Sequence, residues 1–506
     1  GLEDGRVASL DGASRSAPGG REVDAGGRVV VPGLIDSHMH LLKGGLSLGQ
    51  LDLSQVRSRA EFGQAIADRH AALPPEQWLV AGGWSSENWP SRELPDKSWL
   101  RAAGDRPCVC YRMDMHAAVV NDAVLRLCDL THDPPGGWIQ RDSTSGGPTG
   151  LMIEAAAWTL VNPLVPKPDA QTRRAALLEA QRHAHPMGLT SVGSMEYQRD
   201  VEDVFKPLRE QLTLRCRITL LDRDWPMDFN YGQSFANDDR LAVIGYKAFI
   251  DGTLGSRTAR MLKEYADDPG NRGLLVELAE SGHLLDWARA VASAGLSPSM
   301  HAIGDEASRL ALDMCDAVGD LCRPRIEHAQ QIDPEDILRF RGRFASMQPL
   351  HKADDCRYVR SRLGDQRLKG TFAFRNLHSA GAILAFGSDW PVVSCDPLLG
   401  IRTAVTGLTL DGEAFAPHQN LTIEESFRGY TVDAARCLQM DKAGVLTPGM
   451  LADLVMFDRD PFAADWVDAP PRVCMTMCGG EVVYDGLRMD AKAQAIRAPI
   501  RATAAS

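Results

Sequence analysis

The sequence predicts an α/β fold: a closed (β/α)8 barrel of the TIM type, with a small β-sandwich domain formed by both chain ends. From about residue 171 onward, apolar strand-like segments alternate with amphipathic helix-like segments, a pattern typical of parallel βαβ units. Counting one strand near the start of the chain, eight strands are expected, and residues of metal-ligand type stand where five of them end. The active site of such a barrel lies at the carboxyl ends of its strands.

The chain opens with a Gly-rich segment, residues 1–30, whose short alternating stretches favour small antiparallel strands over helices. The first long strand is expected at residues 29–40, where an apolar run and a Pro-Gly break lead into His38 and His40. Because side chains alternate faces along a strand, the two imidazoles point the same way and can chelate one metal ion. The alternative is one packed and one solvated histidine.

The composition changes between residues 51 and 162, where Pro-Pro and Gly-Gly breaks interrupt the chain. Six of the ten tryptophans fall in this stretch: Trp78, Trp84, Trp89, Trp99, Trp138 and Trp158. We therefore expect residues 51–170 to form an insertion after the first strand that covers the barrel mouth. Trp84 and His116 are the candidates for lining the pocket beneath it.

The barrel domain is expected to comprise residues 31–50 and 171–439. Its remaining strands are expected at residues 189–194, 214–221, 243–251, 296–302, 324–328, 344–349 and 382–389. Helices are expected at residues 171–185, 277–294, 306–318 and 423–438. Strand patterns return at residues 453–458, 473–478 and 481–484, so residues 440–490 are expected to pair with residues 1–30 in the β-sandwich.

Composition and charge narrow the class of protein. The net charge of -12 argues against a nucleic-acid surface or an anionic membrane partner. No run of about 18 apolar residues is present, and the first residues lack a signal-peptide pattern, although the chain does not begin with Met and a secretion signal stays open. The eleven cysteines are scattered without a disulfide-like framework. We expect a cytoplasmic homo-oligomer that acts on a small molecule, without nucleic-acid or membrane partners.

Lys247 and three further residues complete the candidate site at the strand ends. Lys247 is flanked by Tyr, Ala, Phe and Ile, so it should be desolvated and neutral, and a neutral amine can take up CO₂ to form a carbamate. His301, His328 and Asp389 end the fifth, sixth and eighth expected strands. Imidazole and carboxylate suit Zn²⁺ and similar ions. A pure packing explanation would require all these groups to converge on one barrel face by coincidence.

These motifs resemble the metal-dependent amidohydrolase superfamily, in its amidohydrolase family 3 branch, which includes N-substituted formamide deformylases. The resemblance rests on residues 32–40, 246–252, 301–305, 326–330, 387–391 and 449–455, and spans nearly the whole chain. It implies one metal ion on His38, His40 and Asp389, and another on His301 and His328. Carboxylated Lys247 would lie between them, and the metal would be one or two zinc ions. The chain departs from the family in lacking much of the usual N-terminal strand segment.

Three further residues are candidates for substrate binding, each with a simpler alternative. His116 lies in the insertion and resembles a family position near the pocket, or it is a hydrogen-bonded structural histidine. His351, just past the seventh strand, could steady the substrate or an oxyanion, or it is a solvated loop residue. Arg257 could hold a carboxylate or brace its own loop.

The function expected from these features is metal-dependent hydrolysis of a C–N bond. The substrate would be an N-acyl or N-formyl amide with an apolar substituent, attacked by metal-activated hydroxide, with Asp389 as general base and then general acid. One alternative is hydrolytic deamination of a heterocycle by the same chemistry. Another is a barrel that has lost catalysis and serves as a binding module.

Overall fold

The computed structural model describes residues 1–10, 22–86, 89–91 and 93–487. Its centre is an eight-stranded parallel sheet in which each strand pairs with its predecessor among the eight along the chain. The strands are β4 (Leu34–Met39), β11 (Leu189–Glu196), β12 (Arg215–Leu220), β13 (Leu241–Phe249), β14 (Ser297–Ala302), β15 (Arg325–His328), β16 (Phe344–Met347) and β17 (Ile383–Phe386). The chain after β17 returns to β4, where the Asp389 amide donates to the His38 carbonyl at 2.7 Å. The sheet is thus a nearly closed barrel, which confirms the predicted fold class.

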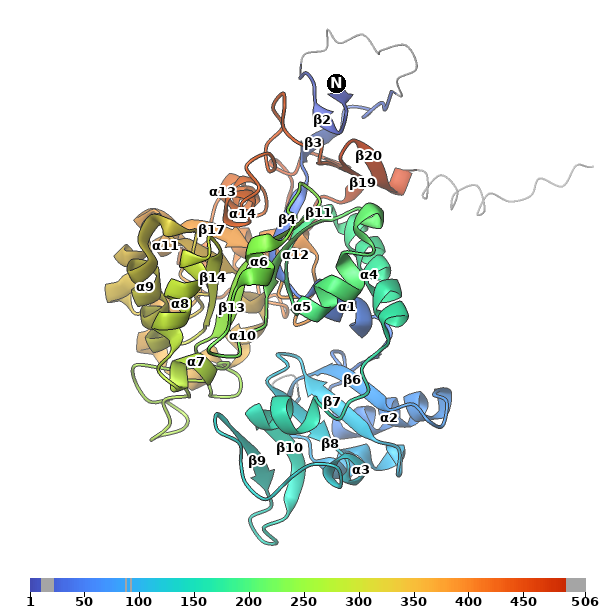
Figure 1. Cartoon of the computed structure of the whole chain (residues 1–506), viewed down its shortest axis with the longest axis vertical. Helices are drawn as coiled ribbons and strands as arrows, with labels where there is room; N and C mark the ends of the chain where they lie inside the picture. Colours follow the sequence, from blue (N-terminus) through green and yellow to red (C-terminus); the bar gives the residue numbers. More distant parts are fainter. Residues whose placement is uncertain (11–21, 87–88, 92, 488–506) are drawn as a thin grey trace, which may run out of the picture.

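Helices alternate with these strands and cover the outside of the barrel (Figure 1). They include α4 (Ala170–Ala184), α8 (Leu284–Ser293), α9 (Asp305–Val318), α10 (Pro349–Leu363), α11 (Phe374–Ala380) and α12 (Pro397–Thr406). Two helices predicted as continuous are each broken in two. The first becomes α7 (Glu277–Glu280) and α8, because Gly282 has a φ of 77° that no helix accommodates. The second becomes α13 (Ile423–Gly429) and α14 (Val432–Cys437), because Thr431 has a non-helical backbone.

The predicted first strand is also two strands. β3 (Val29–Pro32) pairs with a C-terminal strand, whereas β4 lies in the barrel. The chain passes from one sheet to the other at Gly33, whose amide donates to the Asp453 carbonyl at 2.8 Å. A Cβ at Gly33 would lie 2.2 Å from Oγ1 of Thr190, so only glycine fits this crossing.

Both chain ends contribute to one small antiparallel sheet. Its four strands, in spatial order, are β20 (Glu481–Asp485), β19 (Val473–Cys478), β18 (Leu454–Phe457) and β3. A separate hairpin of β1 (Leu2–Glu3) and β2 (Arg6–Val7) is bonded to the segment before β18 through the Val7 amide and the Met450 carbonyl. The expected sandwich is therefore one sheet and a hairpin. Residues 11–21 and 488–490 of the predicted domain lie outside the described residues.

Most of the predicted insertion forms a lobe of its own beyond the barrel, on the side away from the small sheet (Figure 1). Its six-stranded sheet has the order β5-β6-β7-β8-β10-β9. The strands are β5 (Leu51–Asp52), β6 (Leu79–Trp84), β7 (Cys108–Arg112), β8 (Ala117–Val120), β9 (Gly137–Arg141) and β10 (Pro148–Glu154). Helix α2 (Arg59–Ala72) packs against this sheet through Phe62 and Ile66, which share a buried core with Trp84, Trp89 and Trp99.

Two further features concern the chain as a whole. Within the described ranges, no helix is both long and apolar enough to cross a membrane. All eleven cysteines are free thiols, and most of them are buried in the cores of the barrel and the insertion. Burial of this kind is typical of cysteines that pack as small apolar residues.

Candidate metal centre

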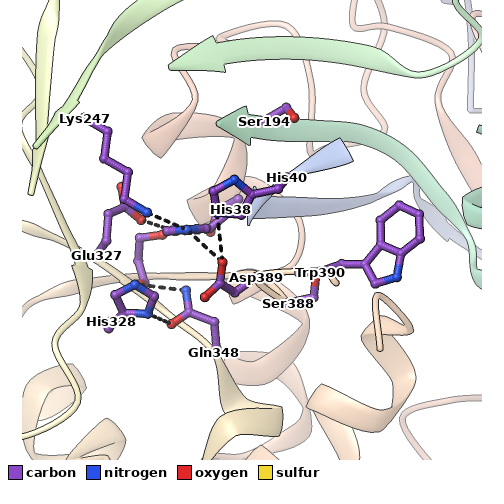
Figure 2. Close-up of polar contacts among 12 residues, drawn as sticks. His38, His40, Ser194, Lys247, Glu327, His328, Gln348, Ser388, Asp389 and Trp390 are labelled. Atoms are coloured by element: carbon purple, nitrogen blue, oxygen red, sulfur yellow. Dashed lines mark hydrogen bonds and ion pairs between the residues drawn. The ribbon is translucent and has the colours of Figure 1, made fainter. Parts of the chain in front are cut away.

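Three of the predicted ligand residues meet at the carboxyl ends of the barrel strands. His38, His328 and Asp389 each offer a ligand atom, and these atoms all lie within 4.8 Å of one another. His40, which follows β4 and precedes α1 (Leu41–Ser47), places its Nε2 3.4 Å from Oδ1 of Asp389. Figure 2 shows these side chains converging, and β4 and β17, which lead to His40 and Asp389, are the two ends of the sheet order. The closure of the barrel therefore assembles the site.

The other two predicted ligand residues border the same cluster. Nζ of Lys247, on β13, lies 3.2 Å from Nε2 of His38 (Figure 2). The ring centroid of His301, at the end of β14, lies 4.6 Å from that of His328. All six residues predicted to bind metal are thus gathered in one place.

Backbone conformation helps to aim two of these side chains. His328 and Asp389 have φ angles of 71° and 60°, in the left-handed region that non-glycine residues rarely adopt. Such a conformation costs about 1–3 kcal/mol and persists where the surrounding structure enforces it. His328 is the last residue of β15 and Asp389 follows the end of β17, so the backbone turns at or just beyond the end of each strand.

Burial sets the charge states of the cluster. Burial lowers the pKa of His301 and His328 well below the usual range, and that of His40 to about 4. Burial would raise the pKa of the Asp389 carboxyl, but the facing His38 and His40 hold it well below its usual value. Burial and Lys247 would lower the pKa of His38, but the Glu327 and Asp389 carboxylates raise it above its usual value. At neutral pH His40, His301 and His328 are therefore neutral imidazoles beside an ionised carboxylate. That is the donor set that Zn²⁺ and related divalent ions bind.

Each of three histidines in the centre has a polar partner on its Nδ1, which fixes the ring and leaves Nε2 toward the cluster. The pairs are His38 with Glu327 at 2.5 Å, His301 with Asp251 at 3.0 Å, and His328 with Gln348 at 2.8 Å. Partners of this kind orient metal-binding histidines in proteins. Sequence spacing alone does not predict these pairings.

Glu327 and Asp251 are themselves held in place by further polar groups. Glu327 is fully buried, accepts a hydrogen bond from Oγ of Ser299 at 2.5 Å, and lies 2.9 Å from Nε of Arg325. Burial opposes its ionisation, but Arg325 and His38 hold the pKa of Glu327 well below its usual range. Asp251 accepts bonds from three backbone amides, while burial raises its pKa to about 7. The sequence does contain a clue to the role of Glu327, because Arg325 and Glu327 are charged residues within a short strand that is otherwise expected to be buried.

His116 reaches the centre from the insertion. It lies between β7 and β8, with its ring centroid 5.7 Å from that of His301. Its Nδ1 is 2.7 Å from Oε2 of Glu154, which is fully buried. The insertion therefore brings a hydrogen-bonded histidine beside the predicted ligands.

The two remaining candidates for substrate binding, His351 and Arg257, lie in different surroundings. His351, in the first turn of α10, stacks on His328 with ring centroids 6.1 Å apart. Its Nε2 is buried and has no hydrogen-bond partner among the described residues. Arg257 instead pairs with Asp267, with Nη2 2.9 Å from Oδ2, contacts that support the loop-bracing alternative.

The prediction that Trp84 lines the pocket is wrong. Trp84 is fully buried in the core of the insertion, stacks on Trp89, and donates its indole N–H to the Cys110 carbonyl at 2.7 Å. It ends a strand whose alternation turns it into that core. The aromatic side chains near the centre are instead Trp158 and Phe249, with ring centroids 6.2 Å apart.

Other proteins are similar to this chain in sequence or in fold. The family model described as "Amidohydrolase family" matches residues 21–484, a range that includes all six predicted ligands. "Protein LONG AFTER FAR-RED 3" of Arabidopsis thaliana is 36% identical, covering 96% of this chain and 86% of that protein. "N-substituted formamide deformylase" of Arthrobacter pascens is 24% identical, covering 88% and 86%. The crystal structure of an uncharacterized metal-dependent hydrolase from Pyrococcus horikoshii OT3 matches with a TM-score of 0.72 at 29% identity, covering 88% of this chain and 89% of that one.

Proposed function

The chain belongs to the amidohydrolase family, and from that premise we propose that it hydrolyses the C–N bond of an N-acyl or N-formyl amide with an apolar substituent. The observation that carries the proposal is the buried cluster of His38, His328 and Asp389, whose ligand atoms all lie within 4.8 Å of one another. The relative from Arthrobacter pascens is named for N-substituted formamides, which supports this class of substrate.

The donor atoms fit divalent metal ions, and we propose zinc. His38, His40 and Asp389 would hold one ion, and His301 and His328 a second. When bound, such an ion polarises a carbonyl and lowers the pKa of its water towards neutrality. The unpartnered Nε2 of His351 fits a centre that is completed by a further group, since buried nitrogens normally have partners.

Lys247 is proposed to carry a carbamate, whose oxygens would add to the ligands of the metal centre. Burial lowers the pKa of its ammonium, and the nearby Arg325 and Arg223 add to this, against the opposing charges of Asp389 and Glu327. A neutral amine attacks CO₂, forming an N–C bond while one C–O π bond opens and one proton is released to water, and the carbamate carries one negative charge shared by two oxygens. This modification would turn the Lys247 amine into an additional anionic ligand.

Asp389 is the proposed proton-transfer residue. As an ionised carboxylate it accepts the proton of the attacking water and then delivers it to the leaving nitrogen, a role that contributes roughly 10²–10⁴-fold to rate. His351 and His116 are proposed to contact the substrate, because His351 has an unpartnered buried nitrogen and His116 lies beside His301.

The test is a substrate panel on the metal-loaded protein, with metal content measured by mass spectrometry. We expect amine release from N-formyl or N-acyl amides. Asp389→Asn should lower kcat by about 10²-fold or more while retaining some metal. Asp396→Asn is the matched control. Asp396 caps the first turn of α12 by accepting the Leu398 amide, and an Asn side chain can accept the same hydrogen bond. Ammonia release from purines or pyrimidines without amide cleavage would instead support deamination, and metal binding without any turnover would support a binding module.

A further inference from the structure

Trp158 and Phe249 form an aromatic pair across the boundary between the insertion and the barrel. Trp158 lies in the short helix Ala156–Val161, which follows β10, and Phe249 is the last residue of β13. Their ring centroids are 6.2 Å apart with planes inclined at 47°. Both side chains are only partly buried, although Lys247 and His301 beside them are buried. Each residue of the pair therefore keeps part of its surface accessible.

Each ring of the pair also contacts the centre. Trp158 packs edge-on to His116 with ring centroids 5.0 Å apart. Phe249 lies 5.1 Å from the ring of His301, and Nζ of Lys247 is 4.8 Å from the Phe249 centroid. A substrate whose reacting carbon or nitrogen lies at the cluster could therefore place its substituent against these rings.

Further polar contacts hold the two rings in place. The indole N–H of Trp158 donates to the Met115 carbonyl at 3.1 Å. The Arg223 guanidinium lies 4.9 Å from the Phe249 centroid and is fixed by paired contacts to Glu277. Rings held in this way offer a preformed apolar surface, which binds an apolar group at a lower entropic cost than a mobile one.

We propose that Trp158 and Phe249 form the specificity subsite for the substituent of the substrate, and that they select an aromatic or other bulky apolar group. The inference rests on the proposed function and deepens it by naming the substrate class and the residues that choose it. Offset or edge-to-face contact with two rings favours a planar aromatic group over a short alkyl group. The insertion then supplies one wall of the subsite and the barrel supplies the other.

The test compares two substrates that share the scissile bond, N-(2-phenylethyl)formamide and N-ethylformamide, with the metal-loaded enzyme. Trp158→Ala should lower kcat/KM for the phenylethyl substrate by about tenfold and for the ethyl substrate by less than about threefold. Trp158→Phe should restore most of the loss, because it keeps an aromatic face, and Phe249→Leu should reproduce the selectivity change. Trp78→Ala is the matched control, since Trp78 is a partly buried tryptophan on the same core cluster as Trp158 but lines a different surface hollow, with His70 and Arg106.

Equal losses for both substrates in Trp158→Ala, or no loss for either, would overturn the subsite. Metal content and thermal unfolding of each variant separate a subsite effect from misfolding. If the wild-type enzyme cleaves neither formamide, the proposed reaction fails, and the subsite is tested by NMR binding of 2-phenylethylamine and ethylamine to the metal-loaded protein. Selective binding of phenylethylamine that Trp158→Ala abolishes would support the subsite independently, and unselective or unchanged binding would overturn it.

Discussion

Lys247 is the residue whose chemical state matters most to the centre, because its amine lies among the predicted metal ligands. Nζ is 3.2 Å from Nε2 of His38. An ammonium in this position would prevent a metal ion from binding that nitrogen. Burial favours the neutral amine. The same burial that keeps His301 and His328 neutral therefore also prepares Lys247 for carboxylation.

The first prediction follows from this state of Lys247. Lys247→Ala should abolish amide hydrolysis, and millimolar formate or acetate should restore part of it, because a small carboxylate can replace the carbamate oxygens. Lys352→Ala is the control, since Lys352 is another buried lysine whose pKa burial lowers, to about 8. Any activity it loses should not return with added acid. An unmodified amine at residue 247 in the crystal structure of the fully metal-loaded, active enzyme would refute the carbamate.

The second prediction concerns Glu327, which fixes the ring of His38. Glu327→Gln keeps the shape but removes the charge that holds Nδ1 of His38, so metal affinity should fall about 10–100-fold. Affinity is measured by competition with a chromophoric chelator. Glu335→Gln, at an exposed position, provides the control. Unchanged affinity in Glu327→Gln would mean that the carboxylate serves only to neutralise Arg325.

At the scale of elements, the tryptophans of the insertion have two different roles: some pack its core, and another lies beside residues of the metal centre. Trp84, at the end of β6, packs with Trp89 and Trp99 and stabilises the insertion. Trp158, in the helix after β10, faces His116 and Phe249 instead. The position of each tryptophan relative to its strand or helix, rather than its residue type, decides which task it performs.

The third prediction separates these tasks. Trp84→Ala leaves a large cavity and an unpaired Cys110 carbonyl, so the free energy of unfolding of the insertion should fall by about 3–5 kcal/mol. Urea denaturation followed by tryptophan fluorescence measures this change. The Michaelis constants of the folded enzyme should stay the same, because Trp84 has no surface in the pocket. A changed substrate preference without a stability loss would contradict the packing role.

At the scale of the whole molecule, a buried ion pair joins the barrel to the small sheet. Arg215, the first residue of β12, binds Asp453 through two contacts of 2.6 and 2.9 Å. Asp453 directly precedes β18, and its Oδ1 also accepts the Gly479 amide at 2.7 Å. The sheet built from both chain ends is thus anchored to the strand that neighbours the lysine-bearing β13.

The fourth prediction tests this anchor. Arg215→Met leaves the Asp453 carboxylate buried without its cation, which typically costs about 3–5 kcal/mol. The midpoint of urea unfolding should fall, with metal content unchanged at low urea. Arg182→Met, which removes an exposed ion pair with Glu179, should shift the midpoint little. Equal shifts in the two variants would show that the small sheet is held by apolar packing alone.

The sequence by itself determined the barrel and its six ligand candidates. Strand and helix periods are local, and parallel strands in one barrel necessarily end on the same face, so residues such as His301 and His328 could be placed together without coordinates. Local breaks were less visible: the crossing at Gly33 depends on the side chain of Thr190, more than a hundred residues away in the chain.

Only the tertiary structure decided which residues surround the ligands. The contact of Glu327 with His38 and that of His116 with His301 join strands and lobes that no sequence spacing relates. The same is true of the tryptophans, because a Trp-rich stretch reveals apolar bulk but not whether a given ring faces a core or a pocket. That choice depends on which strand face meets another element, and the long-range packing of the insertion on the barrel sets it.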